Sequence, residues 1–180
     1  LVDYIRELYH KYGYGEVITP QVLDVNLWKT SGHYDNYAEN MYFTTAEERE
    51  YAVKPMNCPC HCLMFRGSKH SYRDLPIRMA EFGKVHRYEP SGALHGLLRV
   101  RHFTQDDAHI FCTETQMEQE CRDVVALILD IYKDFGFDNV RIKLSTRPEN
   151  RIGSDEIWDK LEGALSSALE SMNMPYELFP

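Results

Sequence analysis

The segment from Arg99 to His109 carries the side-chain types needed to bind a charged ligand that contains a ring. Successive side chains of a β-strand alternate between its two faces. One face would therefore carry two guanidiniums, an aromatic ring, an amide, a carboxylate and an imidazole, from Arg99, Arg101, Phe103, Gln105, Asp107 and His109. A strand with its polar side in water would have no use for Phe103 and His109. The pattern favours a binding site over a solvated surface.

A cluster of thiols and imidazoles forms a second candidate site, in the segment Asn-Cys-Pro-Cys-His-Cys at 57–62. Zinc takes thiolate and imidazole ligands, and a zinc site that stays open to substrate uses three protein ligands. Cys58 lies just before a predicted helix, and His109 is its natural partner from the strand. The spacing matches no zinc finger. For the remaining cysteines we prefer the simpler interpretation of small core residues, namely Cys60, Cys62, Cys112 and Cys121.

The segment His-Arg-Tyr-Glu at 86–89 adds groups that suit a nucleotide. Arg87 and Glu89 share one strand face and would lie opposite Arg99 and Phe103 in a hairpin. A guanidinium fork suits phosphate or carboxylate, a carboxylate can accept from an exocyclic amine, and an aromatic ring can stack on a purine. The sequence contains no P-loop and no Gly-x-Gly-x-x-Gly motif. Taken alone, an ordinary cross-strand ion pair remains the simpler interpretation of these charges.

Composition limits the class of protein. With 180 residues, 43% of them hydrophobic, the chain can bury one core, so one domain is the default. Twenty basic and 28 acidic residues give a net charge of −8, which argues against a purely electrostatic nucleic-acid binder. The five cysteines do not form a secreted disulfide framework, and the longest apolar runs are too short to span a membrane. We expect a cytoplasmic protein, and we expect this chain to be part of a longer one.

The hydrophobic periodicity predicts helices and strands without a regular βαβ repeat, which favours an α+β fold over a parallel sheet. Strands 82–89 and 99–111 should form an antiparallel hairpin with a long loop. We expect Thr115 and Glu118 to form a capping box and Ser154 to cap the last helix. The predicted helices are 1–12, 21–32, 59–65, 115–135 and 155–172. The other predicted strands are 15–20, 41–44, 51–54 and 140–144.

Together these motifs resemble the class II aminoacyl-tRNA synthetases. Residues 13–20 resemble motif 1 of that class, whose proline helps to build a dimer interface, and residues 82–103 resemble motif 2. The segments 54–58 and 105–109 are similar to those of the threonyl-tRNA synthetase family within the class. The resemblance covers essentially all of residues 1–180 and implies a single catalytic-domain fragment. It implies a class II antiparallel β-sheet flanked by helices, incomplete at its C-terminal side, with motif 3 and the anticodon-binding and editing domains elsewhere.

The resemblance also implies roles for the residues around ATP. Arg87 would hold the α-phosphate and the amino-acid carboxylate, and Arg99 would hold the γ-phosphate, so both would be catalytic. Glu89 would read the adenine amine and Phe103 would stack on adenine. Mg²⁺ would accompany ATP. Activation would then depend on cationic groups that stabilise developing charge and hold the reactants in line.

For the amino-acid side, the resemblance implies a site that tells threonine from valine. Cys58 and His109 would be two of three ligands of one Zn²⁺, with the third outside this chain. Asp107 would accept the substrate hydroxyl, and Met56 and Gln105 would line the pocket. An apolar pocket rejects an isostere poorly. A metal bond and a hydrogen bond that valine cannot make would supply the missing discrimination.

The implied activity is ATP-dependent formation of threonyl-adenylate and ligation of threonine to tRNA(Thr), by a protein that is a homodimer at full length. The isolated fragment would be weak or inactive. Three alternatives stay open: a relative that charges a carrier other than tRNA, a non-catalytic paralogue or dimerisation module, and a zinc-binding structural protein. Cys60 stands where the family usually has glycine. A thiol near a helix N-terminus could be acidified and reactive, or could offer zinc an unwanted ligand.

Overall fold

The computed structural model describes residues 1–149 and 151–179, which form two compact units. One unit comprises Leu1–Tyr12 and Phe111–Pro180, and the other comprises Gly13–Ile110. Every residue predicted to bind ATP, threonine or zinc lies in the second unit. The expectation of a single catalytic domain over residues 1–180 stays a prediction.

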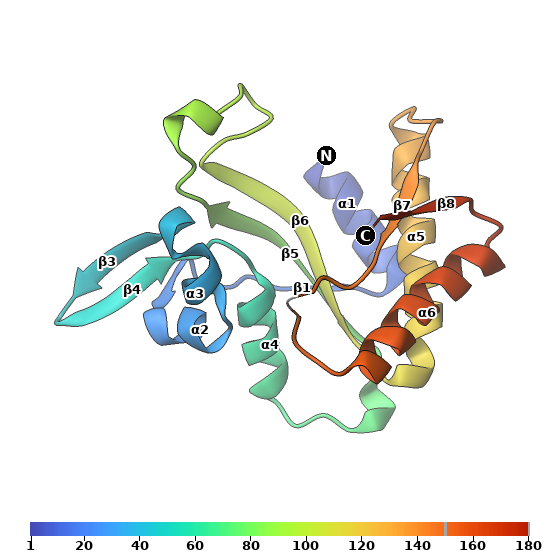
Figure 1. The fold of residues 1–180 in the computed structure, drawn as a ribbon, viewed down its shortest axis with the longest axis horizontal. Coiled ribbons are helices and arrows are strands. Elements are labelled where there is room, and N and C mark those ends of the chain that lie inside the picture. Colours follow the sequence, from blue (N-terminus) through green and yellow to red (C-terminus); the bar gives the residue numbers. More distant parts are fainter. Residues whose placement is uncertain (150, 180) are drawn as a thin grey trace. The chain divides into compact units, whose positions relative to one another are not determined.

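The site in the second unit is built on a three-stranded sheet with the order β1-β5-β6. β1 runs parallel to β5, with Gly15 opposite Met79. β5 and β6 are long neighbouring strands that run in opposite directions (Figure 1). The predicted antiparallel hairpin is therefore confirmed. The strands are β1 (Gly15–Glu16), β5 (Ile77–His86) and β6 (His102–Phe111).

Both hairpin strands are shorter at the loop end than the sequence predicts. Arg87 and Glu89 follow β5, and Arg99 precedes β6. The reason lies in the backbone of Tyr88, whose N–H donates to the carbonyl of Asn40 at 2.8 Å while its own carbonyl accepts from the Asn40 side chain at 3.1 Å. Tyr88 thus pairs with another part of the unit instead of with β6.

Side chains of β6 alternate as the sequence predicts. His102, Thr104, Asp106 and Ala108 are exposed. The opposite face is half-buried and carries the chemical groups singled out above, Phe103, Gln105, Asp107 and His109. The period-two pattern therefore predicted correctly which side chains share the half-buried face of this strand.

A second, fully antiparallel sheet in this unit has the order β2-β4-β3. The predicted helix at 21–32 is wrong at its start, because residues 22–24 form a strand that pairs with β4. The helix begins only after Asp24. The Asp24 carboxylate caps it by accepting a hydrogen bond from the Asn26 N–H at 2.9 Å. The β3–β4 hairpin is longer than predicted, because Glu47 and Glu48 adopt φ values of 50° and 63° and make a tight turn. The elements are β2 (Val22–Asp24), α2 (Val25–Thr30), α3 (His33–Tyr37), η1 (Ala38–Asn40), β3 (Tyr42–Ala46) and β4 (Arg49–Val53).

Apolar side chains from α2, from β4 and from Met41, which follows η1, pack together and hold this second sheet to its helices. Trp28 and Ala52 have no exposed surface and Met41 is 5% exposed. Leu23, Leu27 and Tyr34 pack around them. The helix α4 (Cys58–Arg66) follows β4, with Pro59 in its first turn, and the short η2 (Tyr72–Asp74) and η3 (Ser91–Ala93) precede and follow β5. Proline suits a helix start because its missing N–H would have no partner there.

The first unit contains the helices α1, α5 and α6 and a two-stranded parallel sheet. Tyr4 and Tyr12 of α1 donate hydrogen bonds to Asp134 and Asp130 of α5 at 2.7 and 2.6 Å. β7 and β8 are parallel and are joined through α6, so this unit contains a parallel βαβ connection. The elements are α1 (Val2–Tyr12), η4 (Glu114–Gln116), α5 (Met117–Asp134), β7 (Ile142–Ser145), α6 (Asp155–Ser171) and β8 (Tyr176–Phe179).

Two predicted caps in this unit differ from the structure. The capping box forms between Thr113 and Gln116 instead of Thr115 and Glu118, because a turn of 3-10 helix precedes α5. Ser154 does occupy the N-cap position of α6, but its side chain makes no capping hydrogen bond.

Within the described residues, no helix is both long enough and apolar enough to cross a membrane.

Candidate active site

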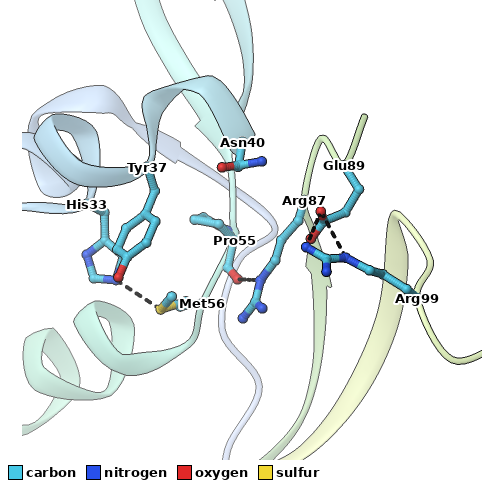
Figure 2. Close-up of a pocket in the computed structure, with 8 residues that line it drawn as sticks. All are labelled: His33, Tyr37, Asn40, Pro55, Met56, Arg87, Glu89 and Arg99. Atoms are coloured by element: carbon cyan, nitrogen blue, oxygen red, sulfur yellow. Dashed lines mark hydrogen bonds and ion pairs between the residues drawn. The ribbon is translucent and has the colours of Figure 1, made fainter. Parts of the chain in front are cut away.

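A pocket of about 220 Å³ lies where the β5 end meets the segment that follows β4 and the helix α3 (Figure 2). Its lining combines charged groups from the hairpin with side chains from α3, η1 and the segment that follows β4. The lining residues are His33, Tyr37, Asn40, Pro55, Met56, Arg87, Glu89 and Arg99. Four of them, Met56, Arg87, Glu89 and Arg99, were predicted as site residues.

A second pocket of about 330 Å³ shares Arg87, Glu89 and Arg99 with the first. Its other walls are Phe103 of β6 and the loop residues Leu97, Leu98 and Val100. The three charged side chains therefore stand between two hollows, one beside Met56 and one beside Phe103. A ligand with a charged centre, an aromatic group on one side and a smaller group on the other would match this arrangement.

Arg87 is held from two directions. Its Nε donates to the carbonyl of Pro55 at 3.3 Å, and its guanidinium lies over the Phe103 ring at 5.2 Å from the ring centroid. Its backbone N–H also donates to the Arg101 carbonyl at 2.9 Å, which fixes the point where the hairpin strands separate. These contacts leave the terminal guanidinium nitrogens directed at the pocket (Figure 2), where they could bind a phosphate or carboxylate.

Glu89 and Arg99 form an ion pair across the loop end of the hairpin. The Arg99 Nη2 and Nε atoms donate to the same Glu89 carboxylate oxygen at 2.9 and 3.2 Å. The Glu89 side chain is 13% exposed, whereas that of Arg99 is 58% exposed. The second Glu89 oxygen has no bond to Arg99, so the carboxylate retains an acceptor for a ligand amine. The prediction that these charges lie together is confirmed.

Asp107 lies farther along the same face of β6 and is oriented by Asn57. The Asn57 side-chain amide donates to the Asp107 carboxylate at 2.8 Å. Asn57 has no exposed surface and packs directly over Gly83 of β5, where a Cβ atom would lie 2.2 Å from its amide nitrogen. Gly83 is therefore needed for the close approach that places Asn57, and through it Asp107.

The two predicted zinc ligands flank Asp107. Cys58 begins α4 and is half-buried, and burial, helped by the negative charge of Asp107, raises the pKa of its thiol. Burial lowers the pKa of His109, which keeps its ring neutral. The His109 Nδ1 atom is hydrogen-bonded to His61 at 2.8 Å, and its Nε2 atom has no hydrogen-bond partner within residues 1–149 and 151–179.

A thiol and an imidazole with a vacant lone pair are the donor types that zinc prefers, so these residues fit the ion that the resemblance implies. Across the described part of the chain, no three His, Cys, Asp or Glu side chains are grouped closely enough to hold a metal ion. Cys58 and His109 would therefore need at least one further donor from outside that part. Gln105 shares the β6 face of His109 and is half-buried.

The other cysteines divide by burial. Cys60 is 3% exposed, and burial raises the pKa of its thiol, so the interpretation of Cys60 as an acidified, reactive thiol is wrong. Its position as the third residue of α4 does not outweigh the cost of ionising a thiol away from water. Cys62 is exposed, which corrects its assignment as a core residue, while Cys112 and Cys121 are partly buried.

Comparison with known proteins identifies the family to which this chain belongs. The model of the tRNA synthetase class II core domain (G, H, P, S and T) matches residues 42–174. The chain belongs to the class II tRNA synthetase core-domain family. It is 59% identical over 180 residues to a threonine–tRNA ligase of Bdellovibrio bacteriovorus and 58% identical over 178 residues to one of Thiobacillus denitrificans. The two alignments include 100% and 99% of this chain, but only 27% and 28% of the two ligases.

Among solved structures, one described as the RNA binding domain of threonyl-tRNA synthetase from Cryptosporidium parvum Iowa II is similar, with a TM-score of 0.94 and 48% identity. The similarity covers 99% of this chain and 44% of that one. The resemblance stated from the motifs, and the α+β class II fold that it implied, are therefore confirmed. The chain spans about a quarter of the length of the curated relatives it matches.

Within this class II core domain, the structure adds residues that the sequence did not single out. His33 lines the first pocket, with Nε2 at 3.2 Å from the Met56 sulfur and Nδ1 at 2.8 Å from the Ser31 hydroxyl. Burial lowers the pKa of His33, so its imidazole is neutral. Tyr37 and Asn40 complete this wall. His33, Tyr37 and Asn40 follow a turn at Gly32, which has φ of 76°. Such a turn indicates a loop and not a site.

Proposed function

We propose that this chain forms the ATP and amino-acid site of a protein that activates L-threonine to threonyl-adenylate and transfers it to tRNA(Thr). The observation that carries the proposal is the row Arg87, Glu89 and Arg99 between two pockets, with Asp107 and His109 farther along, on the adjoining strand β6. The similarity to threonine–tRNA ligases over the whole chain supports it.

The pocket beside Phe103 suits the nucleotide. A purine could stack on the Phe103 ring, and Glu89 could accept from its exocyclic amine through the oxygen that Arg99 leaves unoccupied. Arg87 would then hold the α-phosphate and the substrate carboxylate together, while Arg99 would turn from Glu89 toward the γ-phosphate, accompanied by Mg²⁺. An oxygen of the threonine carboxylate attacks the α-phosphorus and pyrophosphate leaves. Fixed guanidiniums would favour this step because they need no reorganisation as charge develops.

The amino-acid side would discriminate through Cys58, His109 and Asp107, with Met56 and Gln105 as neighbours. A zinc ion held there would supply a Lewis-acid centre that takes the amino group and hydroxyl of threonine. The Asp107 carboxylate, held by Asn57 at 2.8 Å, would accept the hydroxyl proton in a hydrogen bond. A substrate that lacks the hydroxyl would lose this hydrogen bond to Asp107, and a site built to bind a hydroxyl rejects such a substrate strongly.

Transfer to tRNA and assembly into a homodimer belong to the same proposal. A hydroxyl of the tRNA 3′ end attacks the threonyl carbonyl and AMP leaves. Ile18 lies within the segment that resembles motif 1, two residues before Pro20, and is 88% exposed, which suits a residue covered by a second subunit.

The test is threonine-dependent exchange of pyrophosphate into ATP, measured on the full-length protein with valine and serine as comparators and with zinc removed in parallel. We expect exchange that favours threonine over valine, collapses without zinc and returns when zinc is restored. Charging of tRNA(Thr) should follow in the same preparation.

Three outcomes would contradict parts of this proposal. Absence of threonine-dependent exchange would refute threonine activation. Exchange that is indifferent to zinc would refute the roles of Cys58 and His109. Exchange without charging of tRNA(Thr) would favour a relative that charges a different carrier.

A further inference from the structure

A buried polar network lies behind the β6 face and none of its members belongs to either pocket. It comprises Thr19, Lys54, His61 and Glu81, each 4% exposed or less. The Lys54 ammonium donates to the Thr19 hydroxyl at 2.8 Å and to Glu81 Oε1 at 3.1 Å. The Thr19 N–H donates to the same Glu81 oxygen at 2.9 Å. A buried ion pair is seldom more stable than well-packed apolar side chains, so fold stability alone does not account for this network.

The network extends to His109 through His61. Glu81 Oε2 lies 3.0 Å from His61 Nε2, and His61 Nδ1 lies 2.8 Å from His109 Nδ1. The two rings meet nearly at right angles, with an interplanar angle of 85°. A carboxylate, an imidazole and a second imidazole therefore stand in one hydrogen-bonded row that ends at the predicted metal ligand.

The position of each proton in this row follows from which atoms can donate. Burial alone would raise the pKa of Glu81, but the hydrogen bonds from Thr19 and Lys54 outweigh it and lower that pKa. The ionised carboxylate can only accept, so the proton of His61 must lie on Nε2. With its one proton on Nε2, facing Glu81 at 3.0 Å, the His61 ring offers a lone pair at Nδ1.

The same logic places the proton of His109. Because His61 Nδ1 accepts, His109 Nδ1 must be the donor in the 2.8 Å contact between the rings. With its proton on Nδ1, the His109 ring has its lone pair on Nε2, the atom without a partner in the described residues. That is the tautomer a metal ligand needs.

We propose that Glu81 and His61 are positioning residues that fix His109 in the Nδ1–H tautomer and present its Nε2 lone pair for zinc. This deepens the proposed function and rests on it for the identity of the metal. Metal-bound histidines commonly donate their other N–H directly to a carboxylate or carbonyl. Here an intervening imidazole carries the orienting effect of Glu81 while keeping its negative charge away from the metal.

The test uses two substitutions at one position of the full-length protein. In His61→Gln the amide can still donate to Glu81 and accept from His109, so the direction of the row is kept. In His61→Leu both hydrogen bonds are lost with a similar side-chain volume. Zinc affinity is measured by competition with a chromophoric chelator, with Cys58→Ser as the reference for loss of a ligand. We expect His61→Leu to weaken zinc binding by about tenfold to a hundredfold and His61→Gln to restore most of it.

A second measurement is independent of the metal. The ¹⁵N shifts of histidine-labelled, zinc-free protein report which ring nitrogen carries the proton, with the His109 signals identified by their loss in His109→Gln. We expect a protonated Nδ1 and an unprotonated Nε2 in the wild type, even if His61→Leu does not fold. A proton on Nε2, or zinc binding by folded His61→Leu equal to that of the wild type, would overturn the proposal. A wild type that binds no zinc would instead refute the zinc site, and the nitrogen shifts would still decide the tautomer.

Discussion

Gly83 is the position where a single methyl group should do the most damage to the site. In Gly83→Ala the new Cβ would lie 2.2, 2.4 and 2.5 Å from the amide nitrogen, oxygen and Cγ of Asn57. Asn57 has no exposed surface into which it could move. The clash therefore forces a shift of the strand or of the start of α4, and overpacking of this kind costs about 1–3 kcal/mol of stability.

The same shift should break the 2.8 Å hydrogen bond from Asn57 to Asp107. A hydrogen bond to a charged group contributes roughly 1.5–3 kcal/mol. At 1.4 kcal/mol for each factor of ten, misplacing Asp107 should lower kcat/KM for threonine by roughly tenfold to a hundredfold. We would measure the urea midpoint and threonine-dependent pyrophosphate exchange on the full-length protein.

Two further variants separate the two effects. Gly163→Ala in α6 is the matched control, because nothing lies within 4 Å of the added Cβ, and it should stabilise the protein by about 0.4–1 kcal/mol without changing exchange. Gly83→Ala combined with Asn57→Ala should regain stability and stay poor in exchange. The reasoning is refuted if Gly83→Ala unfolds at the wild-type midpoint and exchanges pyrophosphate at the wild-type rate.

Other predictions concern the buried network, the specificity carboxylate and the thiols. Lys54→Met leaves Glu81 buried without its counter-ion and should cost about 3–5 kcal/mol in urea unfolding, most of it regained with Glu81→Gln. Because the folded pKa of Glu81 lies below its ordinary value of 4.5, its stabilising contribution should be complete above that pH and lost as pH falls through the folded pKa, as an acid unfolding series would show. Asp107→Ala should lower kcat/KM for threonine roughly tenfold to a hundredfold in pyrophosphate exchange while that for valine stays near its starting value; equal losses for both would contradict a hydroxyl contact. Iodoacetamide mapped by mass spectrometry should modify exposed Cys62 before buried Cys60, and the reverse order would contradict the burial described for them.

The sequence alone identified which side chains share the half-buried face of β6 because that information is local. A strand places every second side chain on one face, so Phe103, Gln105, Asp107 and His109 had to lie together once the strand formed. The pairing of Glu89 with Arg99 also followed from adjacent strands of one hairpin, even though both residues lie outside the strands themselves. The class II resemblance came from contiguous motifs of the same kind.

Local pattern failed where contacts between distant segments decide the structure. The first residues of the predicted helix at 21–32 form β2 instead, because β4 offers them hydrogen-bond partners. The exposure of Cys62 and the burial of Cys60 depend on which side of α4 faces the rest of its unit. No periodicity in a nine-residue helix fixes that side.

Only the tertiary structure showed which buried residues orient the groups of the site. Asn57 reaches Asp107 across 50 positions of the sequence, and it can do so only because Gly83, on a third segment, has no side chain. His61 joins Glu81 to His109 across separations of 20 and 48 residues. Residue types and their spacing along one strand thus determine which chemistry is available. The orientation of a carboxylate and the position of a ring proton are decided by buried hydrogen bonds between segments far apart in the chain, because burial leaves each such group no water as an alternative partner.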